Sequence, residues 1–106
     1  MGARTFNNKK LFFVEKASRD STTITLNLDS TENLQIIFFY GRLGYDINKP
    51  AFGVIIANLS SGNITACGMD VYSVQTGSVS GSGRVLTITT AQTYAALTFI
   101  STNPIS

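Results

Sequence analysis

Residues 22–29 read Thr-Thr-Ile-Thr-Leu-Asn-Leu-Asp, and this stretch decides the fold class. Ile24, Leu26 and Leu28 alternate with polar neighbours, which is the period of two that a half-buried β-strand produces. No window of eleven or more residues keeps a helical apolar stripe free of glycine and β-branched clusters. Turn-forming residues separate further short runs of the same kind, at 11–16, 34–40, 52–58, 64–74, 84–90 and 94–101. The sequence therefore predicts an all-β chain.

The chain length of 106 residues allows one domain. Seven or eight short antiparallel strands in such a length are typical of a β-sandwich, and both a jelly-roll-like and an immunoglobulin-like topology stay open. We expect residues 1–10 to form a basic N-terminal arm and residues 11–106 to form a single sandwich domain. Within the run 64–74 the apolar parity changes at Gly68, where a bulge or a strand break is expected.

Charged residues make up 13% of the chain, about half the average of roughly 25% in globular proteins. Hydrophobic residues stand at 43% and the formal net charge is +2, so neither disorder nor dedicated nucleic-acid binding is expected. The apolar runs are far shorter than the roughly 20 residues of a membrane-spanning helix. Because no secretory signal is visible either, we expect synthesis in the cytoplasm and no membrane insertion.

The residues that carry most enzyme chemistry are scarce. The chain has no His, which excludes a Ser-His-Asp triad and an ordinary zinc site. No Lys follows a Ser at the spacing of a Ser-Lys dyad, and turns account for several of the carboxylates. The single Cys67 is expected to be a small buried residue. The sequence predicts a protein that is not an enzyme and that has no cofactor and no metal.

Two runs, 34–40 and 52–57, are apolar on both parities. A sandwich strand needs only one apolar face, so a loop, the N-terminal arm or another subunit is expected to cover the second one. Residues 51–106 carry only Asp70 and Arg84 as charges, which leaves their strand edges without the usual protection against pairing. We therefore predict a homo-oligomer, with an interface formed by Ile37, Phe39, Ile55 and Phe52.

The two chain ends are expected to be held in place. Residues 1–10 combine basic side chains with one aromatic, and are predicted either to dock on a partner or to extend a strand of the same subunit. The docking residues would be Arg4, Phe6, Lys9 and Lys10. The tail Thr102–Ser106 is expected to lie against the body or a neighbour.

Small β-sandwiches often bind sugars by stacking them on an aromatic ring beside polar side chains. This chain has no Trp, so tyrosines near loops are the candidate platforms. The predicted glycan contacts are Tyr45, Tyr94 and Asn48, with Gln92 and Asn103 as further polar partners.

The closing pattern of the chain, a Ser/Gly loop leading into alternating strands at 80–90 and 94–100, accompanies a surface rich in Ser, Thr, Asn and Gly. In these features the chain resembles small all-β bacteriophage virion proteins, such as head-decoration, head-fibre and tail-fibre head domains. The resemblance implies a structural protein made in the host cytoplasm and located in the virion. It also implies a homo-oligomer, with a trimer favoured, other virion proteins as partners and no catalytic residues. The alternative is a carbohydrate- or receptor-binding β-sandwich module that recognises a host surface glycan.

Overall fold

A computed structural model describes residues 10–44, 49–68, 71–78 and 84–106. These residues contain strands and turns but no helix, and therefore no helix that could cross a membrane. The strands in chain order are β1 (Phe12–Ala17), β2 (Thr23–Leu28), β3 (Leu34–Arg42), β4 (Pro50–Asn58), β5 (Asn63–Gly68), β6 (Val71–Ser78), β7 (Arg84–Thr90) and β8 (Ala96–Ser101).

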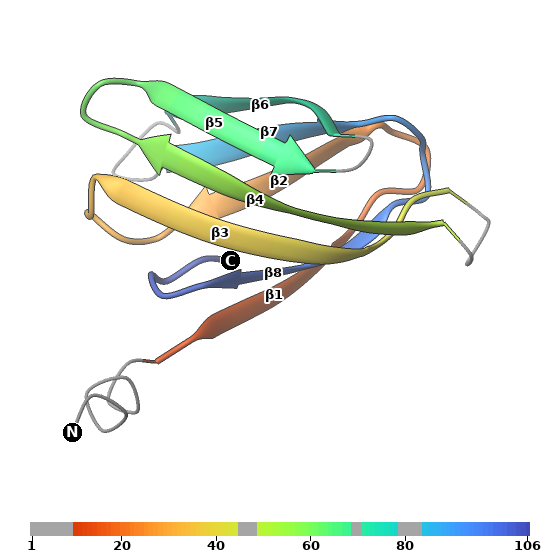
Figure 1. Cartoon of the computed structure of the whole chain (residues 1–106), viewed down its shortest axis with the longest axis horizontal. Helices are drawn as coiled ribbons and strands as arrows, with labels where there is room; N and C mark the ends of the chain where they lie inside the picture. The colour runs from red at the N-terminus through yellow and green to blue at the C-terminus, as the bar shows by residue number, and fades with distance from the viewer. Residues whose placement is uncertain (1–9, 45–48, 69–70, 79–83) are drawn as a thin grey trace.

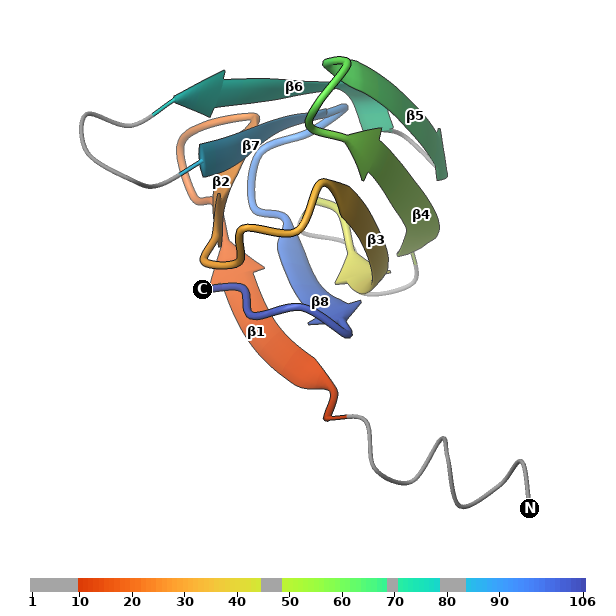
Figure 2. The same ribbon diagram turned by 90° about the vertical axis from the view of Figure 1, so that its left-hand side faces the viewer.

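The strands form two antiparallel sheets that face each other (Figures 1 and 2). The larger sheet has the order β1-β8-β3-β4-β5 and the smaller sheet the order β2-β7-β6. The first two strands therefore pair with the last two, one pair in each sheet, whereas an immunoglobulin sheet keeps its first two strands side by side. This arrangement confirms the prediction of an all-β, single-domain sandwich.

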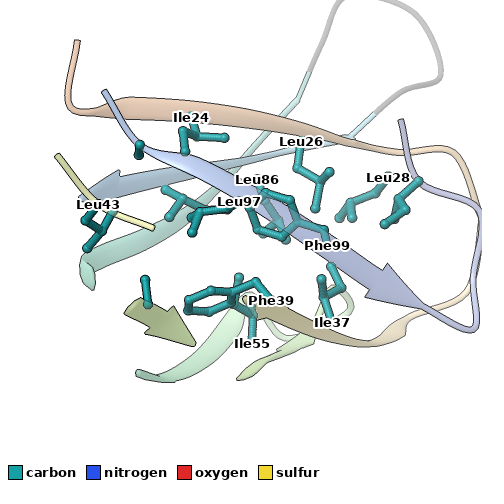
Figure 3. Packing of buried hydrophobic residues seen from close by; sticks show 14 residues of the cluster. Ile24, Leu26, Leu28, Ile37, Phe39, Leu43, Ile55, Leu86, Leu97 and Phe99 are labelled. Atoms are coloured by element: carbon teal, nitrogen blue, oxygen red, sulfur yellow. The ribbon is translucent and has the colours of Figure 1, made fainter. Parts of the chain in front are cut away.

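The core lies between the sheets and follows the alternation seen in the sequence. In β2 the residues Ile24, Leu26 and Leu28 are at most 3% exposed, while their neighbours face solvent. They pack with inward side chains of β3, β4, β7 and β8 (Figure 3). Phe39 and Phe99 form a tilted aromatic pair in this layer, with ring centroids 5.9 Å apart. Burial of this apolar layer supplies the main driving force for the fold.

The run 64–74 divides between the two sheets. Strand β5 ends at Gly68 in the large sheet, and β6 begins at Val71 in the small one. The change of parity at Gly68 therefore marks a strand break at which the chain passes from one sheet to the other. A register irregularity between Val71 and Ser73 follows at the start of β6.

The C-terminal tail lies against the edge of β2. The amide of Asn27 donates to the carbonyl of Ser106 at 2.8 Å, and the amide of Ser106 donates back to Asn27 at 3.1 Å. Ile105 forms a bridge with Leu28 and is only 7% exposed, so its side chain closes this end of the core. The tail is thus held by its own subunit, one of the two arrangements expected from the sequence.

Candidate functional site

Among the described residues, the large hydrophobic side chains that remain exposed all lie on one side of the molecule. They project from the face of the five-stranded sheet that points away from the core, which we call the outer apolar face. A typical soluble monomer has scattered apolar side chains and rarely a contiguous apolar surface of this kind. The outer apolar face consists of Leu11, Phe13, Leu34, Ile36, Phe38, Tyr40, Phe52 and Ile56.

The strand register makes this face continuous. One cross-strand row crosses the whole sheet, because Phe38 is paired with Ile100 on one side and with Val54 on the other. The row continues to the two edge strands through Phe13 and Cys67. Directly opposed side chains on one face of a sheet are within contact distance, so the row forms an apolar stripe over all five strands.

Two hollows flank Phe38 on this face. One has a volume of about 280 Å³ and is lined mainly by Leu11, Ile36 and Ile100. The other has a volume of about 380 Å³ and lies on the side of Phe52 and Val54. The face is therefore ridged, and each hollow is wide enough to receive side chains from another surface.

Charge is scarce on the outer face. Within the five strands, only Glu15 and Arg42 share the parity of the exposed apolar residues. The four aromatic side chains are 54–62% exposed, which corresponds to about 450 Å² of aromatic surface at roughly 200 Å² per side chain. The aliphatic members enlarge the patch beyond the roughly 300–600 Å² of the largest patch on a typical monomer.

The predicted interface residues are only partly on this face. Phe52 is exposed, but Ile37, Phe39 and Ile55 are at most 2% exposed and belong to the core. The prediction that both faces of β3 and β4 are apolar is correct. The prediction that Ile37, Phe39 and Ile55 point outward is wrong, because their side chains point into the core. Successive side chains point to opposite faces of a strand, so the exposed members are the neighbours Ile36, Phe38 and Ile56.

Two other expectations concern Cys67 and the N-terminal arm. Cys67 is exposed, contrary to the expected buried position, and its thiol is free. It lies on the outer face opposite Val54 in the register. Of the predicted docking residues, Lys10 is exposed, whereas Arg4, Phe6 and Lys9 lie outside the described residues.

A third hollow lies at one end of the same sheet, and we call it the polar hollow. Its volume is about 290 Å³, and its wall combines alanine side chains with charged and hydroxyl groups. Tyr94 is the predicted glycan contact that falls here, while Tyr45 and Asn48 lie outside the described residues. The polar hollow is lined by Ala17, Ser18, Arg19, Arg42, Tyr94, Ala95 and Ala96.

The remaining predicted glycan partners do not join Tyr94. Asn103 donates through Nδ2 to the carbonyl of Leu34 at 3.1 Å, which places it at the opposite end of β3 from Arg42. The carbonyl of Gln92 accepts a hydrogen bond from the hydroxyl of Thr90, and Gln92 does not line the hollow. The structure thus keeps Tyr94 as a candidate contact and supplies arginine and serine in place of the amide partners.

The described residues show no metal-binding cluster beside these surfaces. Within the described ranges, no group of three or more His, Cys, Asp or Glu side chains is arranged to hold a metal ion. Comparison of the chain with protein-family models, curated proteins and solved structures gave no match. Function is therefore inferred from two features of the chain itself, the outer apolar face and the polar hollow.

Proposed function

We propose that the protein is a non-enzymatic structural component of a bacteriophage virion, a small decoration or fibre-type protein that assembles through its outer apolar face. The observation that carries this proposal is that every large hydrophobic side chain found exposed in the described part of the chain lies on one face of one sheet. Assembly with further copies of the chain removes this surface from water. A small all-β chain with a Ser-, Thr- and Asn-rich composition also suits a particle component, which is the class that the sequence resembles.

The magnitudes favour association. Two copies that cover each other's aromatic side chains remove about 900 Å² from water, worth about 20 kcal/mol at about 25 cal/mol per Å². This gross gain exceeds the roughly 4–15 kcal/mol that association costs in lost freedom of motion. Because Glu15 and Arg42 are the only charged side chains of the described strands on this face, desolvation of charge takes little away from it.

A cyclic trimer is consistent with the two different hollows on the outer apolar face. In a trimer each subunit uses two different patches, one for each neighbour. The two hollows on either side of Phe38 differ in lining and volume, and so provide two such patches on one sheet. We therefore favour a trimer over a two-fold dimer, in which a single patch would meet its own copy.

The first test compares two variants with the same chemical change. Phe38→Asp places a charge in the middle of the outer face, whereas Thr25→Asp places it at an exposed position of β2 on the other sheet. We expect wild type and Thr25→Asp to be oligomeric by light scattering coupled to size-exclusion chromatography, and Phe38→Asp to be a folded monomer. A monomeric wild type at about 100 µM would overturn the assembly proposal, since that affinity is too weak for a particle component.

Cys67 provides an independent readout without any mutation. Its exposed thiol lies on the outer face, so association should slow its reaction with a maleimide as protein concentration rises. In Phe38→Asp the labelling rate should be independent of concentration. A rate that stays constant in the wild type would mean that the oligomer forms through another surface.

The virion assignment needs its own experiment. We expect the protein to co-sediment with purified phage particles in a density gradient and to be found there by mass spectrometry in a fixed ratio to the major capsid protein. Recovery only in the soluble fraction of the lysate would refute the virion role and leave self-association as a separate property.

A further inference from the structure

The polar hollow is built where the pairing of β1 and β8 ends. Ala17, Ala96 and Arg42 lie in one cross-strand row at the end of the large sheet. The chain then leaves the sheet on both sides, and the amide of Ser18 donates to the carbonyl of Ala95 at 2.9 Å. Two loops and the end of β3 thus meet around one cavity of about 290 Å³.

Ser18 carries an unsatisfied hydroxyl in this place. The residue is only 7% exposed, and its Oγ has no hydrogen-bond partner among the described residues. Buried polar atoms nearly always have a partner, and an orphan calls for an explanation such as a bound group. Ser18 also lines the polar hollow, but its Oγ is sealed from water in the free protein, so a ligand reaches this hydroxyl only if the side chain turns toward the hollow.

The charged groups around the hollow favour an anion. Arg42 is half-buried and is oriented by a hydrogen bond from its Nη1 to the carbonyl of Gly44 at 3.2 Å. Arg19 is exposed beside the hollow and adds a second guanidinium, the group that pairs most readily with a carboxylate. The carboxylate of Asp20 lies outside the lining and accepts from the hydroxyl of Tyr94 at 3.4 Å. The described residues of the lining therefore carry two positive charges and no negative one.

The wall of the hollow shows what kind of molecule carries the anion. Ala17 and Ala96 form a shallow apolar surface, while Ala95 behind them belongs to the core; this surface suits the C–H face of a sugar ring and gives nothing to a bare inorganic ion. Tyr94, held at a φ of 62° that few non-glycine residues adopt, adds an aromatic side wall. The volume lies at the lower limit of small-molecule sites, roughly 300–1,000 Å³, and so admits a single sugar unit.

We propose that the polar hollow binds a sugar acid, with its carboxylate on Arg42 and Arg19, its ring against the alanine wall and one hydroxyl on the Oγ of Ser18. This inference goes beyond the proposed assembly role and does not depend on it, because the hollow occupies the end of the sheet beyond the row of Tyr40 and Phe52. A virion protein could use such a site for an acidic glycan on a cell surface.

The test uses pairs of sugars that differ in the carboxylate. Glucuronate and galacturonate are titrated against the full chain, each beside glucose or galactose, with ¹⁵N amide shifts as the readout. We expect both acids to shift the amides of Ser18, Ala95 and Ala96 with a Kd on the order of millimolar, and the neutral sugars to bind at least 10-fold more weakly. Inorganic phosphate is titrated as a third probe and should not compete.

Variants locate the binding groups. Arg42→Gln and Arg19→Gln should each weaken glucuronate binding about 10-fold, whereas Arg84→Gln, which removes the same charge from an exposed position on β7, should leave it unchanged. Ser18→Ala should weaken binding without lowering the melting temperature, because it removes a hydroxyl that has no partner in the free protein.

Three outcomes would overturn the proposal. The first is the absence of amide shifts with both acids at about 20 mM, a concentration well above the expected Kd. The second is equal binding of phosphate and glucuronate, which would reduce the site to a general anion site. The third is full affinity in both Ser18→Ala and Arg42→Gln. None of these outcomes bears on self-association, which the Phe38 and Cys67 experiments measure separately.

Discussion

Phe39 packs against two glycines of the neighbouring strands and fills the space of their missing side chains. Gly53 is paired with Phe39 on one side and with Gly68 on the other. A Cβ on Gly53 would meet the Cζ of Phe39 and the carbonyl of Cys67, and a Cβ on Gly68 would lie 2.8 Å from the same Cζ. We expect Gly53→Ala to lower the free energy of unfolding by about 2–3 kcal/mol in chemical denaturation, as overpacking does.

Gly77 offers the matched control for this substitution. It also lies in a strand, but a Cβ there would have no atom of the described residues within 4 Å. Gly77→Ala should therefore leave stability unchanged or raise it by up to about 1 kcal/mol, because alanine restricts the unfolded chain. Equal effects of the two substitutions would mean that the ring of Phe39 does not occupy the space above Gly53.

Gln35 explains why the outward side of β3 could not be predicted from the sequence. It shares the parity of Ile37 and Phe39, so its polarity favours placing that side in water. In the structure Gln35 is fully buried, and its Nε2 donates to the carbonyl of Glu32 at 2.9 Å. Its Oε1 accepts from Nδ2 of Asn103 at 3.2 Å. That partner is remote in sequence, and only the folded chain shows that the buried amide is satisfied.

At the scale of elements, the C-terminal tail protects the edge of β2. The amides of Asn27 and Asp29 donate to tail carbonyls, and Ile105 fills the end of the core. We expect Ile105→Ala to cost about 2–4 kcal/mol and to speed hydrogen exchange at Asn27 and Asp29. Thr102→Ala, an exposed change in the same tail, should do neither. Unchanged exchange in Ile105→Ala would show that the backbone pairing alone holds the tail.

The strands also show how much of the fold the alternation of apolar and polar residues can predict. The strand Arg84–Thr90 has the bounds expected from the sequence, because turn residues precede it and its alternation is unbroken. The run 64–74 could be predicted to break but not to change sheets, since either sheet would bury its apolar side. Of the polar hollow only Tyr94 could be predicted: the wall joins alanines and arginines of β1, β3, β8 and the adjoining loops, which only the pairing of the first and last strands brings together.

At the scale of the whole molecule, the shortage of charged residues and the outer apolar face have the same origin in the sequence. Residues 51–106 carry only Asp70 and Arg84, and this half supplies β5, β8 and nearly all of β4 to the outer face. The other exposed apolar side chains come from β1, β3 and the residue before β1, so two distant parts of the chain complete one surface. A surface assembled in this way exists only in the folded state, so association through it, as proposed above, would stabilise the fold.

The melting temperature should consequently depend on protein concentration. Above the dissociation constant, each tenfold rise in concentration adds roughly 0.7–1 kcal/mol per chain, which corresponds to about 3–5 °C for a domain of this size. We expect the wild type to show this rise between about 2 and 200 µM in scanning calorimetry, and Phe38→Asp to melt at one temperature throughout. The Asp substitution falls on an exposed side chain, so its melting temperature should match that of the wild type at the lowest concentration. A wild-type melting temperature that is constant over this range would show that the outer apolar face does not bind further copies of the chain.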